Sequence, residues 1–169
     1  DPLARLVDRD HDEHTLGSER AAKVVERTVG DVVDDHVVAP AQLATLRALV
    51  QRASEHEPVA YLVGKTEFYS LELAVSPACL IPRPETELLV QHSIEYLRGQ
   101  EGQTRMLDLC TGSACIAVAV AKNVPETRIV ATDICDEALS MAAKNVEKYG
   151  LGDRVQLLSG DLFDPILPA

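Results

Sequence analysis

The chain has 169 residues, of which 46% are hydrophobic and 25% charged, a mixture typical of globular proteins that bury a core. Its formal net charge is −11, and no run of Lys or Arg interrupts the acidic background. Because binding to nucleic-acid phosphates needs concentrated positive charge, we expect no direct nucleic-acid partner. A small-molecule enzyme and a partner for a basic protein surface are both compatible with this charge.

The sequence contains no apolar stretch of membrane-spanning length and no signal-peptide core near its start. We therefore expect a cytoplasmic protein without a membrane partner. Four cysteines form no Cys-x-x-Cys pair, and His11 and His14 belong to an acidic segment without a third ligand, so no metal site is predicted. We interpret the cysteines as buried, reduced thiols, with a disulfide framework as the alternative.

The first 65 residues have a helical pattern. Ser18 is a suitable N-cap for a helix that ends near Gly30, and Pro40 opens a second helix. A short third helix follows Pro58 and ends at Gly64. The second helix carries an apolar stripe formed by Leu43, Leu46, Leu49 and Val50. We predict a small helical N-terminal domain over residues 1–65.

A connector over residues 66–84 follows. Residues 66–69 and 71–75 are typical of a β-hairpin, and three prolines in residues 76–84 favour an extended chain. Pro84 is then expected at the first position of a helix that ends at Gly99. The apolar residues of that helix are Leu88, Leu89, Ile94 and Leu97.

Strands and helices alternate over residues 85–169. We predict strands at 106–109, 129–132 and 155–158, separated by helices at 116–121 and 136–149. Asp136 is the expected N-cap of the second of these helices, and Gly150 its stop. This β-α-β-α-β order predicts an α/β fold with a parallel sheet.

Three strand ends carry the informative residues. The segment Asp108-Leu-Cys-Thr-Gly-Ser-Ala-Cys115 joins a strand to a helix, and its small residues allow a ligand to approach the backbone. Asp133 ends the second strand, where an acid can accept hydrogen bonds from ribose hydroxyls. Gly160, Asp161 and Leu162 follow the third strand and can border an adenine ring. Together they predict one nucleoside pocket; taken singly, each is also compatible with an ordinary turn.

Several of these segments resemble a known family. Asp108-Leu-x-Thr-Gly-Ser, Ala131-Thr-Asp133-Ile and Gly160-Asp161-Leu162 are similar to the cofactor motifs of class I S-adenosylmethionine-dependent methyltransferases. Glu57-Pro-Val-Ala-Tyr61-Leu-Val-Gly64, Glu67-Phe68 and Leu80-Ile-Pro-Arg-Pro-Glu-Thr-Glu87 resemble the release factor glutamine methyltransferases. The resemblance covers residues 18–169.

This resemblance implies a Rossmann-like parallel sheet of which the chain contains the first three strands. It implies S-adenosyl-L-methionine as cofactor and a peptide chain release factor as the protein substrate, methylated on a glutamine side-chain nitrogen. Asp133 would bind the ribose, and Asp161 and Leu162 would border the adenine. The methionine end of the cofactor would lie against Cys110, Thr111, Gly112, Ser113 and Ala114. The residues expected to close the site are Arg83, Pro84, Glu85 and Thr86.

The chain departs from the family pattern in two places. Cys110 and Ala114 occupy positions where the family usually has glycine. We expect Ala114 to begin the following helix and Cys110 to crowd the ligand or to disfavour a positive φ. The family's Asn-Pro-Pro-Tyr motif, which holds the target amide, is absent from these 169 residues, so no catalytic residue is predicted.

Two other functions stay open at this point. An adenine amino-methyltransferase acting on nucleic acid would use the same Asn-Pro-Pro-Tyr chemistry, although the acidic balance and the helical N-terminal domain count against it. A non-catalytic cofactor-binding or scaffold fragment is favoured by Cys110 and by the missing motif.

Overall fold

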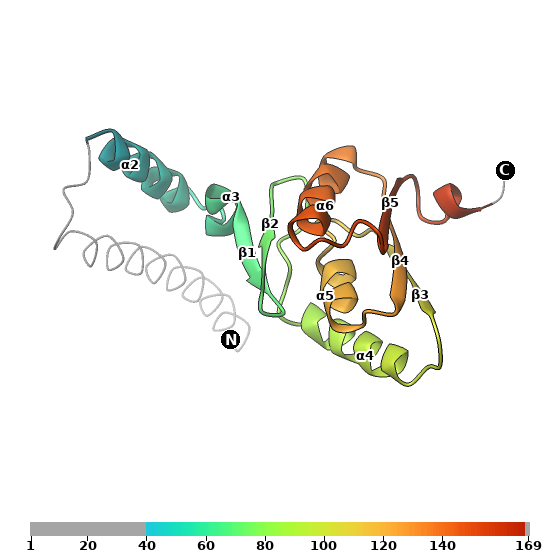
Figure 1. The fold of residues 1–169 in the computed structure, drawn as a ribbon. Helices are drawn as coiled ribbons and strands as arrows, with labels where there is room; N and C mark the ends of the chain where they lie inside the picture. Colours follow the sequence, from blue (N-terminus) through green and yellow to red (C-terminus); the bar gives the residue numbers. More distant parts are fainter. Residues whose placement is uncertain (1–39, 168–169) are drawn as a thin grey trace, which may run out of the picture. The chain divides into compact units, whose positions relative to one another are not determined.

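The computed structural model describes residues 40–167, so the predicted helix between Ser18 and Gly30 lies outside the described residues, as do His11 and His14. The chain divides into two compact units, with the boundary between Leu62 and Val63. Figure 1 shows the described residues coloured by their position in the sequence. None of the helices in the described range is long and apolar enough to cross a membrane.

The described part of the first unit contains α2 (Pro40–Ser54) and α3 (Val59–Val63). On α2, Leu46 and Leu49 are half-buried, whereas Leu43 and Val50 are 37% and 40% exposed. Arg52 Nε donates a hydrogen bond to Glu57 Oε2 at 2.7 Å, which closes the turn between the two helices.

The second unit begins with an antiparallel hairpin of β1 (Lys65–Phe68) and β2 (Leu71–Ala74). Its turn residues Tyr69 and Ser70 have φ values of 50° and 58°, a left-handed geometry that matches the twist of a tight hairpin. Phe68 and Leu73 are buried in the main core. The hairpin is therefore part of the packed second unit.

A parallel sheet in the order β3-β4-β5 forms the centre of this unit. The predicted three-strand α/β fold is thus confirmed. Met106, Ile129 and Val155 lie side by side in the register. Three residues further along each strand, Leu109, Thr132 and Leu158 do the same. The strands are β3 (Thr104–Leu109), β4 (Thr127–Asp133) and β5 (Val155–Ser159).

Three helices accompany the sheet: α4 (Thr86–Arg98), α5 (Cys115–Asn123) and α6 (Asp136–Lys148). Figure 1 shows α5 and α6 on one side of the strands, with α4 along α5. Every residue of α5 from Ala117 to Ala121 is buried, because α5 packs against the sheet and both neighbouring helices. A short 3-10 helix, η1 (Asp164–Ile166), follows β5.

Two helix starts differ from the prediction. Helix α4 begins at Thr86, because Pro84 and Glu85 form a separate turn in which the N–H groups of Thr86 and Glu87 bond to Arg83 and Pro84 carbonyls. Its core face consists of Val90, Ile94 and Leu97, whereas Leu88 and Leu89 are exposed.

The expected N-cap role of Asp136 is also wrong. Cys135 occupies the N-cap in an extended conformation, and Asp136 is the first helical residue of α6. The Asp136 carboxylate accepts a hydrogen bond from Ser159 Oγ at 2.8 Å, so it ties the helix start to the end of β5.

Candidate functional site

The parallel register brings the carboxyl ends of β3, β4 and β5 to one edge of the sheet, and hydrogen bonds join the loops that follow them. Thr111 N–H donates to the Thr132 carbonyl at 2.9 Å, and Gly160 N–H donates to the Asp133 carbonyl at 3.0 Å. Thr132 Oγ1 donates to the Leu162 carbonyl at 3.2 Å. The three predicted strand ends therefore form one connected cluster.

The first loop, residues 110–114, alternates in backbone conformation. Cys110, Gly112 and Ala114 have φ values of 56°, 57° and 60°, so all three are left-handed. This conformation costs a residue with a Cβ roughly 1–2 kcal/mol, and glycine almost nothing. Cys110 thus adopts the positive φ that its Cβ was expected to disfavour, and the chain accommodates it with a side chain in place.

Ala114 differs from the prediction. It is the left-handed N-cap residue of α5, which begins one residue later at Cys115. Its methyl group is fully buried and belongs to the main core, so it does not fill space on the ligand side of the loop. Cys110, by contrast, is exposed.

Asp133 is held in a fixed orientation. Its Oδ2 accepts the Gly112 N–H at 2.8 Å, and its Oδ1 accepts the Cys135 N–H at 3.0 Å. These bonds aim the carboxylate at the first loop while leaving the residue half-buried. Asp133 thus lies at the end of the second strand of the sheet, as predicted, and its hydrogen bonds connect it to the first and third loops.

A second carboxylate, Asp108, lies beneath the same loop. It is 8% exposed and accepts a hydrogen bond from Thr111 Oγ1 at 2.6 Å. Burial raises the pKa of Asp108, and the charge of Asp133 adds to this effect, while the bonds from Thr111 and the Ala117 N–H oppose it. None of the ion pairs found among residues 40–167 involves either acid. The cluster therefore offers uncompensated negative charge, which suits a cationic ligand.

Ser113 contributes a further polar atom. The residue is 2% exposed, and its Oγ is buried with no hydrogen bond of good geometry among the described residues, although the side chain interacts with the Cys115 thiol and lowers the pKa of that thiol. Its carbonyl accepts a hydrogen bond from Asn145 Nδ2 at 2.9 Å. A buried hydroxyl without a well-formed hydrogen bond is the kind of group that a bound ligand can satisfy.

The third loop is tightly built. A Cβ added at Gly160 would lie 2.8 Å from Pro165 Cδ, so only glycine fits there. Leu162 has a φ of 46° and is 49% exposed, and Ile134, directly after Asp133, is 71% exposed. Phe163 is also 49% exposed. Exposed apolar side chains therefore flank the carboxylate, a combination suited to a flat heterocycle beside a ribose.

The segment expected to close the site has a different environment. Arg83, Pro84 and Glu85 are exposed and Thr86 is half-buried, and within the described residues no hydrogen bond joins them to the three loops. Glu87, at the start of α4, accepts the Tyr69 N–H and so links α4 to the hairpin. The later part of the connector lies near the first loop, because a Cβ added at Gly112 would lie 3.7 Å from Cys79 Cβ.

None of the four cysteines forms a disulfide in the described part of the chain, and of the four only Cys79 is buried, so the expectation of four buried thiols is correct for one. Burial, together with the charge of Asp108, raises the pKa of Cys115 to about 11, which keeps this thiol protonated. No group of His, Cys, Asp or Glu suited to a metal ion occurs in the described part of the chain.

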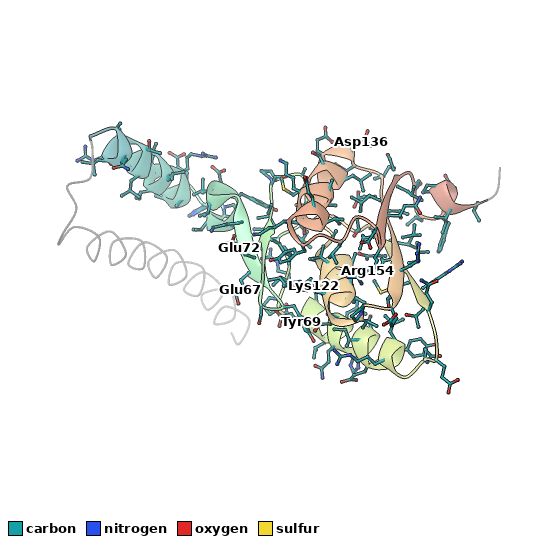
Figure 2. All side chains as sticks on the ribbon, in the orientation of Figure 1. Glu67, Tyr69, Glu72, Lys122, Asp136 and Arg154 are labelled. Atoms are coloured by element: carbon teal, nitrogen blue, oxygen red, sulfur yellow. The ribbon has the colours of Figure 1, made fainter. Side chains whose placement is uncertain are left out.

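A cavity of about 600 Å³ lies elsewhere, between the hairpin turn and the last turn of α5. Its lining includes Glu67, Tyr69 and Lys122, which Figure 2 places together beside the hairpin. Because α5 runs from the first loop toward Lys122, this cavity is at the opposite end of the helix from the carboxylate cluster. We therefore assign the candidate site to the three loops.

Comparison with known proteins identifies the family of this part of the chain. The family described as "Methyltransferase small domain" matches residues 84–168, half of the chain and all of the three-loop cluster. The chain belongs to this family. The domain described as "PrmC N-terminal domain" matches residues 14–64, ahead of the methyltransferase small domain.

Two curated relatives of this chain are named release factor glutamine methyltransferase. The one from Rhodopirellula baltica is 46% identical over 137 residues, covering 79% of this chain and 46% of the relative. The one from Bordetella pertussis is 42% identical over 167 residues, covering 99% and 58%. The chain thus spans about half the length of the curated relatives it matches.

Among solved structures, a human methyltransferase 10 domain containing protein is 27% identical, with a TM-score of 0.47 and coverage of 56% of this chain and 47% of that chain.

Three residues of the cluster were not predicted as site residues: Asp108, Ile134 and Asn145. Asp108 and Ile134 stand inside quoted motifs and could have been found from their position at strand ends. Asn145 carries a different signal, because it interrupts the apolar stripe of α6 formed by Ala138, Ala142 and Val146. A polar residue on a buried face needs hydrogen-bond partners.

Proposed function

We propose that the chain forms the S-adenosyl-L-methionine-binding front part of a methyltransferase that modifies the glutamine side-chain amide of peptide chain release factors. Support comes from the names of the relatives and from the family match over residues 84–168. The observation that carries the proposal is the hydrogen-bonded cluster of three strand ends around Asp133.

The residues present fit this cofactor on two counts. Its sulfonium and ammonium groups are positive, and the cluster contains two carboxylates without a cationic partner among the described residues. The buried Ser113 hydroxyl also lacks a well-formed hydrogen bond there. The Ala114 methyl lies in the core and Cys110 is exposed, so neither departure from glycine excludes the ligand.

We assign the first loop (Cys110, Thr111, Gly112, Ser113 and Ala114) to the methionine end of the cofactor and Asp133 to its ribose. Asp161 and Leu162, together with Ile134, would border the adenine. When bound, the cofactor supplies a methyl group already activated by its sulfonium. This chain's residues would orient that group and exclude water, and they need no acid or base of their own.

Several parts of this function extend beyond the geometry. We keep the proposal that Arg83, Pro84, Glu85 and Thr86 close the site, since the same connector comes close to Gly112 of the first loop at Cys79. The residues that hold the glutamine are expected in an Asn-Pro-Pro-Tyr motif, which this sequence does not contain. A release factor as substrate is consistent with the expected cytoplasmic location.

Calorimetric titration of the chain with S-adenosylhomocysteine tests cofactor binding. We expect saturable binding that Asp133→Ala abolishes and that Asp153→Ala leaves unchanged, because Asp153 is an exposed acid at the other end of α6. A folded chain that does not bind would contradict the proposal and favour a scaffold role.

The substrate is tested separately with the longer protein that carries the Asn-Pro-Pro-Tyr motif. Methyl transfer from labelled cofactor to a release factor, and not to a mixture of DNA and RNA, is the expected result. Transfer to the nucleic acids instead would favour the adenine amino-methyltransferase.

A further inference from the structure

Asn145 on α6 is the most completely buried amide side chain of the described residues and has partners on two other segments. It is 0% exposed, whereas the other buried residues of α6 are all apolar: Ala138, Ala142 and Val146. Its Oδ1 accepts the Ala74 N–H at 2.7 Å, and its Nδ2 donates to the Ala74 carbonyl at 2.9 Å. The second Nδ2 hydrogen reaches the Ser113 carbonyl at 2.9 Å.

The Asn145 amide pairs with both the N–H and the carbonyl of Ala74, as a backbone amide of a neighbouring strand would at the end of β2. The third bond reaches the first loop at Ser113, between the left-handed residues Gly112 and Ala114. Both Nδ2 hydrogens and Oδ1 are engaged, so the amide has little freedom to turn. One side chain therefore joins the hairpin, α6 and the loop.

The loop has few other anchors. Thr111 N–H bonds to Thr132, Ala114 N–H bonds back to Thr111, and Gly112 N–H bonds to Asp133. Ser113 is 2% exposed, and its carbonyl would lose the bond from Asn145 in a place with little access to water. An unpaired buried carbonyl is costly, so the loop would shift toward other conformations.

We propose that Asn145 is a positioning residue for the first loop: through the Ser113 carbonyl it holds residues 110–114 in the ligand-binding conformation and fastens them to the hairpin. This inference rests on the proposed cofactor site. When a binding-competent conformation becomes less populated, the apparent Kd rises by the same factor. Loss of this anchor should raise the Kd for S-adenosylhomocysteine about tenfold or more, the change expected for one buried hydrogen bond.

The test compares Asn145→Leu with Thr127→Val in the same chain. Thr127 is also fully buried, and its hydroxyl bonds to Thr104 at 2.6 Å at the start of β4, at the opposite edge of the sheet from the loop. Both variants are titrated with S-adenosylhomocysteine at temperatures equally far below their own Tm. We expect a raised Kd for Asn145→Leu alone; equal Kd values in the two variants would overturn the inference.

Amide hydrogen exchange supplies a readout that does not need a ligand. In Asn145→Leu the amides of Thr111 and Gly112 should exchange faster, while that of Ile129 in β4 should not change. Unchanged exchange in the loop would overturn the inference. Wild-type chain that fails to bind, together with faster loop exchange in the variant, would contradict the cofactor proposal and leave the positioning role supported.

If Asn145→Leu does not fold, Asn145→Asp replaces it, because aspartate keeps the shape and the acceptor for the Ala74 N–H. It loses at least one of the two donated bonds, so the same direction of change in Kd and in exchange is expected. No change in either would overturn the inference.

Discussion

Substitution of Cys110 by glycine tests whether the first loop stores backbone strain. Cys110 and Ala114 share almost the same left-handed φ, 56° and 60°, but Cys110 is exposed and Ala114 is fully buried. Glycine would remove roughly 1–2 kcal/mol of strain at either position and would cost about 0.5–1 kcal/mol in unfolded-chain entropy. Cys110→Gly should therefore stabilise the fold by about 0.5–1 kcal/mol.

Ala114→Gly has an additional cost, because it removes a buried methyl group worth about 0.8 kcal/mol. The two terms nearly cancel, so its free energy of unfolding should stay close to that of the wild type. Cys135→Gly is the matched control, since Cys135 has an ordinary φ of −94° and gains nothing from glycine. It should be destabilised by about 0.5–1 kcal/mol.

Urea unfolding of the three variants measures these differences, and titration with S-adenosylhomocysteine measures their effect on the site. We expect the order of stability Cys110→Gly, Ala114→Gly, Cys135→Gly, with tighter ligand binding in Cys110→Gly. Equal destabilisation by all three substitutions would refute the assignment of strain to the left-handed positions. Unchanged or weaker binding by Cys110→Gly would refute the link between that strain and the site.

Three further substitutions probe charge and hydrogen bonding. Burial raises the pKa of Asp108 in the folded chain, so the wild type loses stability as pH rises above about 3.8 and this carboxyl ionises. The stability of Asp108→Asn relative to the wild type should therefore increase with rising pH. The same variant should bind S-adenosylhomocysteine more weakly. Ser113→Ala removes a buried hydroxyl without a well-formed hydrogen bond, so it should raise the Tm of the free chain and weaken ligand binding; a fall in both would show that the hydroxyl is already satisfied. Lys65 and Lys148 lower the pKa of Glu72 from 4.5 to about 2, so the small loss of Tm in Glu72→Gln should be present at neutral pH and disappear as pH falls through about 2. The same loss should shrink at about 1 M salt, because these side chains are exposed.

The strands and helices of the second unit could be predicted because short apolar runs alternate with glycine and capping signals. Predicted strand positions fall within the observed β3, β4 and β5, although β3 and β4 each begin two residues earlier. The missing residues, Thr104 and Arg105 at the start of β3, are polar and join the ladder through backbone bonds to β4. Sequence hydrophobicity carries no signal for such bonds.

Other features depend on tertiary contacts. The exposure of Leu88 and Leu89 could not be predicted, because Val90, Ile94 and Leu97 form an equally good helical stripe. The sequence also gives no reason for alanine to adopt a left-handed φ at Ala114, where the packing of its methyl group in the core fixes the backbone. The three strand ends, in contrast, follow directly from the parallel order of the strands.

The electrostatics of the site connect these observations to the proposed ligand. Asp133 accepts two backbone N–H bonds, and Asp108 accepts bonds from the Thr111 hydroxyl and the Ala117 N–H, so both acids are oriented by neutral donors. Neutral donors fix the direction of a carboxylate and leave its charge uncompensated. A cation entering the cluster therefore gains attraction without displacing an existing ion pair of the described residues. A loop held by Asp133 and Asn145, one acid and one amide, is thus suited to a positively charged ligand and poorly suited to a phosphate.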